Sequence, residues 1–164
     1  MSAPVRVELR PAHEQDVDLI HALIVALAEY EREPGAVVGT PAMLRRWLFG
    51  DAPAAEAVIA EVDGAPAGFA IFHGTFSTWE CAPGIWLEDL FVLPEQRRHG
   101  VGQLLLAHVA RVAVERGCDR LGWAALDWNE LALGFYRKLG ADVLDEWKMH
   151  RLSGDALRAV AASA

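Results

Sequence analysis

The chain has 164 residues, 53% of them hydrophobic, and no long polar tract. This length and apolar content predict one domain, residues 1–164, around a buried core. The formal net charge of -8 argues against a nucleic-acid partner, because proteins that bind nucleic acids present a basic face. An acidic surface is typical of a well-solvated protein and would also attract a polycation.

The spacing of cysteines, histidines and apolar residues excludes further classes. Cys81 and Cys118 form no redox or metal-binding motif, and the six histidines do not pair at ligand spacing, so no metal is expected. The N-terminal residues lack the apolar core of a signal peptide, and no apolar run reaches membrane-spanning length. We therefore expect a cytoplasmic protein with reduced thiols and no membrane partner.

The first fifty residues show one strand pattern and two helix patterns. Apolar and polar residues alternate over Val5, Val7 and Leu9 before Pro11, which predicts a strand. A helix face follows from the i, i+3, i+4, i+7 spacing of Ile20, Leu23, Ile24 and Leu27. Thr40-Pro41 has the residue types of an N-cap and a first helical position, so a second helix is expected over Ala42–Phe49.

The middle of the chain indicates three strands. Ala57–Val62 and Ala67–Phe76 are expected to form a hairpin, because Asp63-Gly64 between them favours a tight turn. After a loop over Ser77–Gly84, a strand is expected over Ile85–Leu93.

The remainder alternates helix and strand patterns again. A helix is expected over Gln103–Arg116, ended by a left-handed Gly117, and a strand over Leu121–Leu126. Further elements are a helix from the N-cap Asn129 to Leu139, closed by Gly140, two short strands within Val143–Leu152, and a terminal helix from Asp155. Together these elements predict a mixed, mostly antiparallel sheet flanked by helices.

One loop carries a pattern suited to anion binding. Arg97-Arg98-His99-Gly100-Val101-Gly102 lies between the strand Ile85–Leu93 and the helix Gln103–Arg116. The two glycines let the main chain approach a ligand closely, and the first N–H groups of a helix have no partner within it. Such a loop favours a pyrophosphate, although a strand-to-helix turn would also explain the two glycines.

Two other classes of glycine loop are excluded by their spacing. A Walker loop requires Lys-Ser or Lys-Thr after its glycines, and neither follows Gly102. A dinucleotide-binding fingerprint requires a third glycine where this chain has Leu105.

The order of the motifs resembles the GCN5-related N-acetyltransferase (GNAT) superfamily, and within it the diamine (spermidine/spermine) and thialysine N-acetyltransferases. The pieces that recur in that subgroup are Arg10-Pro11, Ala28-Glu29-Tyr30-Glu31, Leu87-Glu88-Asp89, Trp128-Asn129-Glu130 and Phe135-Tyr136. The resemblance extends from about Arg10 to Leu152. It implies an α/β (α+β) GNAT fold, with a sheet of about six or seven strands, splayed between strands 4 and 5 and flanked by about four helices.

The resemblance further implies acetyl-CoA as the donor and assigns residues to it. The main-chain N–H groups of residues 98–103 would hold the pyrophosphate: Arg98, His99, Gly100, Val101, Gly102 and Gln103. Arg97 or Arg98 would add charge-assisted contacts. The backbone of Leu90, Phe91 and Val92 would pair with the pantetheine arm, and Asn129 would be both helix N-cap and CoA contact.

Two side chains are candidates for proton transfer during direct attack of the amine on the thioester. Tyr136 is the expected general acid, because a phenol with a pKa of about 10 stays protonated and can donate to a thiolate. Glu88 is the expected base, acting directly or through a water. Adjacent strand residues such as Glu88 and Asp89 point to opposite faces, so both can reach one site only if a bulge intervenes.

The acceptor is expected to be a primary amine of a small molecule, held by Tyr30 and Glu31 together with Glu88, Asp89, Trp123 and Asp145. Because Arg32 interrupts the acidic cluster, a diamine or polyamine, a lysine-like molecule and an amino-group antibiotic all stay open. The alternatives are a CoA-binding regulatory module without turnover and an acetyltransferase acting on protein amino groups.

The resemblance also implies a homodimer with an interface near the C-terminal strands. The apolar residues there suit either that interface or a core: Val143, Leu144, Trp147 and Met149.

Overall fold

The computed structural model describes residues 5–163. The chain forms two compact units, one ending at Ala124 and the other beginning at Ala125. No helix among the described residues is both long and apolar enough to cross a bilayer.

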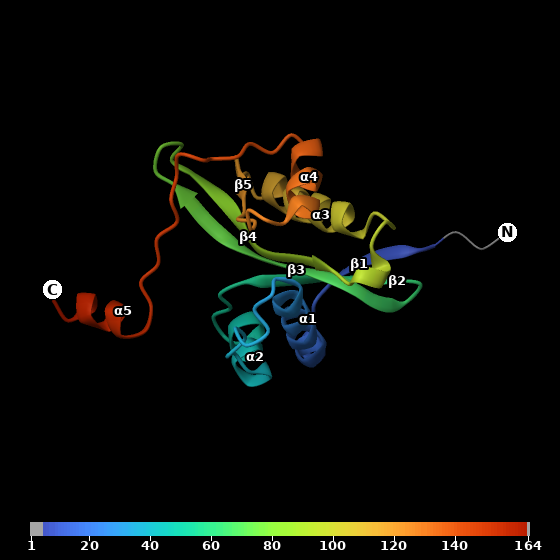
Figure 1. The fold of residues 1–164 in the computed structure, drawn as a ribbon, viewed down its shortest axis with the longest axis horizontal. Coiled ribbons are helices and arrows are strands. Elements are labelled where there is room, and N and C mark those ends of the chain that lie inside the picture. The colour runs from blue at the N-terminus through green and yellow to red at the C-terminus, as the bar shows by residue number, and fades with distance from the viewer. Residues whose placement is uncertain (1–4, 164) are drawn as a thin grey trace. The chain divides into compact units, whose positions relative to one another are not determined.

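The first unit is built on one twisted sheet (Figure 1). Its strands lie in chain order: β1 (Val7–Pro11), β2 (Glu56–Val62), β3 (Ala65–Ser77), β4 (Ala82–Val92) and β5 (Leu121–Gly122). Neighbouring strands are antiparallel except β4 and β5, which are parallel. The predicted mixed, mostly antiparallel sheet is therefore confirmed, and the predicted Asp63-Gly64 turn joins β2 to β3 with positive φ at both residues.

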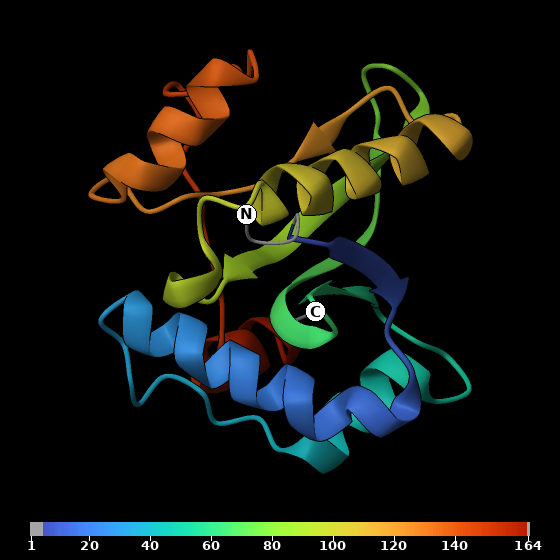
Figure 2. The ribbon, with the colours of Figure 1, turned by 90° about the vertical axis from the view of Figure 1, so that its right-hand side faces the viewer.

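Helices cover both faces of this sheet. Helices α1 (Val17–Tyr30) and α2 (Pro41–Phe49) lie on one face, and α3 (Val101–Glu115) lies on the other (Figures 1 and 2). The core between α1, α2 and the sheet is a cluster of buried apolar side chains: Ile20, Leu23, Leu48, Ile59, Phe69, Ile71 and Phe91. The predicted N-cap of α2 is confirmed, because the Met43 N–H donates to Thr40 Oγ1.

Arg10, part of the Arg10-Pro11 motif, has a structural contact set. Its guanidinium bonds Asp16, in the short 3₁₀ turn η1 (Glu14–Asp16), and Glu61 of β2, each at 2.8 Å. The bond from Arg10 lowers the pKa of the Asp16 carboxyl, and the two bonds together tie β1 to its neighbours.

The second unit contains two helices among its described residues, α4 (Glu130–Lys138) and α5 (Gly154–Ala161). Asn129 caps α4 as predicted, because its Oδ1 accepts a hydrogen bond from the Ala132 N–H at 3.2 Å. The terminal helix predicted from Asp155 is also confirmed.

Several element predictions are wrong. The strand expected over Leu121–Leu126 ends at Gly122, and residues 143–152 contain no strand. Residues 5–163 therefore hold five strands instead of the expected six or seven. A strand persists only where a neighbour takes its main-chain hydrogen bonds, and no described strand pairs with residues 143–152. Val143, Leu144, Trp147 and Met149 are accordingly exposed rather than core.

Candidate active site

A β-bulge in β4 sets the direction of the predicted carboxylates. In the register with β3, Leu87 lies opposite Phe72 and Asp89 lies opposite Ile71, so Glu88 is an extra residue without a partner. Directly opposed residues share a face, which places Asp89 on the same face as Ile71, the face that α1 and α2 cover. The bulge required for both carboxylates to reach one site is present.

Three of the predicted acidic residues interact on this face. Burial, together with the negative charges of Glu88 and Glu31, raises the pKa of Asp89 to about 6. Burial also raises the pKa of Glu31, which directly follows α1. Carboxylates that repel one another in a partly buried place gain stability when a cation binds among them.

The sequence interpretation missed His73, a partner of one of these carboxylates. The Nε2 atom of His73 lies 3.7 Å from Glu88 Oε2, and both side chains are exposed. His73 lies on β3 opposite Trp86, two residues before Glu88. The two consecutive strand patterns, Ala67–Phe76 and Ile85–Leu93, were the signal that could have found this contact, had they been paired as neighbours.

Tyr30, the last residue of α1, lies beside β4. Its ring centroid is 6.2 Å from that of Phe91, and the guanidinium carbon of Arg97 lies 4.5 Å from the Tyr30 centroid. The first unit therefore brings Tyr30, Glu31 and the bulge of β4 to the same side of the sheet.

The second half of β4 has an open edge. The pairing of β5 with β4 covers only Ile85 and Trp86, and no other described strand continues it. The expected splay between strands 4 and 5 is confirmed. The two strands separate where the short β5 ends, since β4 continues for six residues beyond Trp86, the last position that pairs with β5.

Along this part of β4, the main-chain N–H and C=O groups of successive residues point alternately toward β3 and toward the open edge. A side chain at Gly68 would meet the Phe91 carbonyl oxygen at 2.4 Å, so that carbonyl faces β3. By the alternation of an antiparallel pair, the main-chain groups of Leu90 and Val92 face away from β3. Three residues were expected to pair with a pantetheine arm, and the main-chain groups of one of them, Phe91, point toward β3 and not toward the open edge. The Val92 carbonyl accepts a hydrogen bond from Arg97 Nε at 3.1 Å.

The predicted anion loop forms a row of available N–H groups at the start of α3. Arg98 and Gly100 have φ values of 74° and 75°, the left-handed region, and α3 begins at Val101. Within residues 5–163, no protein group accepts a hydrogen bond from the amides of residues 98–103. The first amide with a partner is that of Leu104, which donates to the Gly100 carbonyl.

This row of amides, residues 98–103, lies next to the open edge of β4. A Cβ atom at Gly102 would lie 3.7 Å from the Val92 side chain and 3.8 Å from the Leu90 side chain. Unpartnered amides, a helix N-terminus and an open strand edge therefore adjoin, and each can receive a polar, extended, anionic ligand.

The remaining predicted site residues are Trp123, at the end of the first unit, and Tyr136 and Asp145 of the second unit. Trp123 follows the end of β5 and is half-buried. In the second unit, the Tyr136 ring lies 5.3 Å from that of Phe135 and is half-buried, whereas Asp145 is exposed in a segment without regular structure.

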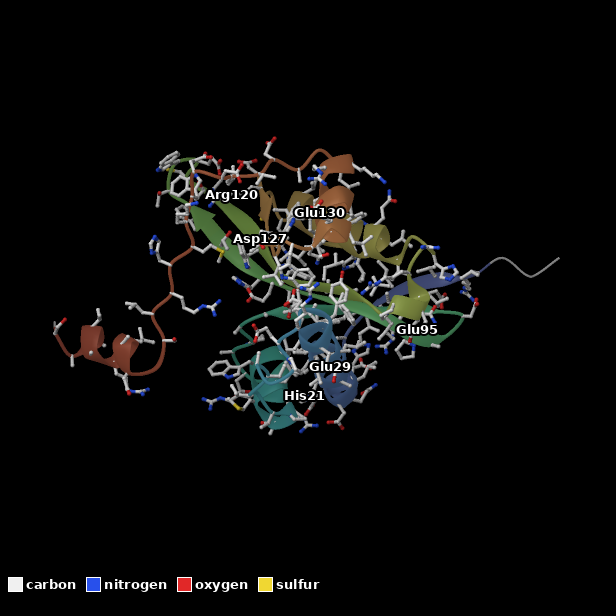
Figure 3. The ribbon with its side chains drawn as sticks, in the orientation of Figure 1. His21, Glu29, Glu95, Arg120, Asp127 and Glu130 are labelled. Atoms are coloured by element: carbon white, nitrogen blue, oxygen red, sulfur yellow. The ribbon has the colours of Figure 1, made fainter. Side chains whose placement is uncertain are left out.

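A separate apolar groove lies between α1 and α2. Its lining includes Ile24, Val38, Met43 and Trp47, and no carboxylate of the described residues is among its lining side chains. His21, labelled in Figure 3, lines it as well, with Nε2 2.9 Å from the Gly39 carbonyl oxygen. This groove is distinct from the acidic cluster.

Among the described residues, no three histidine, cysteine or acidic side chains are placed to hold a metal ion.

Comparison with known proteins assigns the chain to a family. Residues 20–141 match the model of the acetyltransferase (GNAT) family. The thialysine N-epsilon-acetyltransferase of Bos taurus is 37% identical over 166 residues, which cover 94% of this chain and 97% of that protein. The L-ornithine N5-acetyltransferase NATA1 of Arabidopsis thaliana is 30% identical over 93% of this chain and 86% of that protein. The chain belongs to the GNAT family and is an N-acetyltransferase.

Solved structures agree on the fold. An integron cassette protein from the mobile metagenome of V. cholerae superposes with a TM-score of 0.78 and 26% identity, over 94% of this chain and 97% of that one. An aminoglycoside acetyltransferase from a soil metagenome gives a TM-score of 0.73 at 17% identity, over 90% and 95% of the two chains, which is a likeness of fold alone. The predicted GNAT fold and the resemblance to the thialysine subgroup are confirmed.

Proposed function

We propose that the protein transfers an acetyl group from acetyl-CoA to a primary amine of a small, doubly cationic molecule, a lysine-like amino acid or a diamine. The observation that carries this proposal is the row of unpartnered amides over residues 98–103, next to the open edge of β4. These groups fit the two chemical parts of CoA, a pyrophosphate and an amide-containing arm.

On the donor side, the main-chain N–H groups of residues 98–103 bind the pyrophosphate. Arg98 is exposed at the start of this row and adds a charge-assisted contact. The main-chain groups of Leu90 and the N–H group of Val92, which face the open edge, bind the pantetheine arm. Asn129, whose Oδ1 caps α4, also contacts the donor.

On the acceptor side, the acidic cluster binds the amine. Glu31 holds the distal ammonium group, and the pair Glu88 and Asp89 receives the attacking one. This amine must lose a proton before it attacks. Burial raises the pKa of Asp89 to about 6, which suits it to be the final proton acceptor, with Glu88 relaying the proton directly or through a water.

The departing thiolate requires a proton, which Tyr136 supplies. A phenol is protonated at neutral pH and is a stronger hydrogen-bond donor than water, so it stabilises the developing negative charge on sulfur. Tyr136 lies on α4, seven residues after the N-cap Asn129, so the two side chains lie on one stripe of the helix.

The proposed acceptor class rests on the cluster's charge and on the relatives. One relative is named for thialysine and another for L-ornithine, and both of these acceptors carry two amino groups. Three carboxylates, one of them with a pKa raised by burial and by the charges of the other two, suit a dication better than a single ammonium group.

The test is thiol release from acetyl-CoA with a panel of amines. We expect turnover with thialysine, ornithine and short diamines, and much slower turnover with a monoamine of equal length. Tight CoA binding without thiol release for any amine would indicate a regulatory module instead. Turnover only with peptides would indicate an enzyme acting on protein amino groups.

The protein is also proposed to act as a homodimer. In the single chain the side chains of Val143, Leu144, Trp147 and Met149 are all more than 60% exposed, although residues of this size and character are usually covered. Analytical ultracentrifugation is expected to give twice the chain mass, and Trp147→Glu is expected to shift the protein toward monomer. A wild-type chain that sediments as a monomer would contradict this proposal.

A further inference from the structure

Arg97 makes three contacts that connect different parts of the first unit. Its Nε donates to the Val92 carbonyl at 3.1 Å, its guanidinium lies over the Tyr30 ring at 4.5 Å, and the Phe91 ring lies 5.9 Å away. The main chain of Arg97 leads directly into the row of amides that begins at Arg98. One half-buried side chain thus connects the anion loop, the open strand edge and the end of α1.

These contacts give Arg97 a role different from that of Arg98. A guanidinium stacked on an aromatic ring with Nε already donating is held in one plane, which restricts its approach to another ligand. Arg98, by contrast, is exposed. The Val92 carbonyl, one of the groups on the open edge, is occupied by Arg97.

We propose that Arg97 is a positioning residue that fixes the anion loop to Tyr30 and thereby couples CoA binding to acceptor binding. This inference rests on the proposed function, because Glu31, which directly follows Tyr30, forms part of the acceptor site there. Coupling between two ligands is reciprocal, so loss of the contact between Arg97 and Tyr30 should weaken both the effect of CoA on amine affinity and the effect of the amine on CoA affinity.

The first test is CoA affinity measured by calorimetry without any amine. Tyr30→Leu removes the ring under Arg97 and is expected to weaken CoA binding about three- to tenfold, the range for a partly buried cation–π contact. Tyr30→Phe retains an aromatic face and is expected to retain wild-type CoA affinity. An unchanged CoA affinity in Tyr30→Leu would overturn the proposal.

A double-mutant cycle separates coupling from general disturbance. Arg97→Gln is expected to weaken CoA binding, and adding Tyr30→Leu to it is expected to cause no further loss. The matched control is Arg98→Gln, whose effect is expected to add to that of Tyr30→Leu. Additive effects of Arg97→Gln and Tyr30→Leu would contradict the inference.

The effect of an Arg97 substitution on the amine KM provides a second test, which does not require Tyr30→Leu to fold. Arg97→Gln is expected to raise the amine KM about threefold at saturating acetyl-CoA, whereas Arg98→Gln changes the KM for acetyl-CoA alone. An amine KM unaffected by Arg97→Gln would count against the coupling. Failure of the wild-type chain to bind CoA would instead reject the proposed function.

Discussion

Ile85 and Trp86 in the first half of β4 have strand partners on both sides, whereas Leu90 and Val92 in the second half have one on a single side. The first half is buried: Ile85 and Leu87 are each 2% exposed. The second half begins with the bulge at Glu88 and carries the carboxylates. Phe91 of the second half also belongs to the core, so the two halves differ in their main-chain edges, and only the half with one open edge offers main-chain groups to a ligand.

The largest effect on stability is expected in the paired half. Leu87→Ala removes a fully buried side chain and is expected to lower the free energy of unfolding by about 2–5 kcal/mol. Leu90→Ala, in the open half, removes a half-buried side chain and is expected to cost less than half as much. Urea denaturation monitored by tryptophan fluorescence measures both. Equal losses would contradict the difference in burial between these two side chains.

The largest effect on activity is expected from Asp89→Asn. Loss of the proton acceptor is expected to lower kcat/KM about a hundredfold or more, within the range for general acid–base catalysis. In the wild type, kcat/KM should rise with pH through about 6 as Asp89 loses its proton, and this step should disappear in the variant. A variant that keeps the step in its pH profile would assign the titration to another group.

Asp89→Asn should have the opposite effect on stability. The folded pKa of Asp89, about 6, lies above its ordinary value of 3.8, so the folded state holds the proton more tightly than the unfolded state. Its contribution to stability is therefore fully present below about pH 4 and is lost as the pH rises through 6. At pH 8 the variant is expected to be more stable than the wild type by about 1–3 kcal/mol. Destabilisation would indicate a structural carboxylate.

Tyr136 belongs to the second unit, so its replacement separates proton donation from binding at the open half of β4. Tyr136→Phe is expected to lower kcat at least about tenfold, with CoA affinity nearly unchanged. Stopped assays at saturating acetyl-CoA give kcat, and calorimetry gives the affinity. Wild-type kinetics in this variant would exclude Tyr136 from proton transfer.

The smallest of these effects is expected in the loop that follows the open half. Gly100→Val places a β-branched residue at a φ of 75° and is expected to weaken CoA binding about tenfold. Gly100→Asn is the matched control, because asparagine adopts this conformation more readily, and it should lose less affinity. Calorimetry that finds equal affinity in both variants would contradict a role for this backbone conformation.

Local chemistry determined which elements could be predicted. The Thr40 and Asn129 caps and the Asp63-Gly64 turn depend on residues within four positions, and all three are present. The start of β4 at Ala82 was missed because Pro83 and Gly84 indicated a loop. Proline is tolerated there because Ala82 and Pro83 precede the first residue that pairs with β5.

The features that could not be predicted depend on pairing between strands that are distant in the sequence. The apolar pattern of Leu121–Leu126 is that of a strand, but its length depends on how far β4 stays beside it. The convergence of Glu31 with Asp89 likewise depends on the bulge at Glu88, which appears only in the register with β3. The resemblance supplied the site residues, and the structure supplied the contacts of Arg97 and His73.

The central claim is that the amides of residues 98–103 bind the pyrophosphate of CoA. The most direct test is a titration of ¹⁵N-labelled protein with CoA, followed by amide chemical shifts in NMR spectra. We predict large downfield shifts for several amides within residues 98–103, together with shifts at Leu90 and Val92 on the open edge. Saturating CoA that leaves these amides unmoved while shifting others would contradict the account.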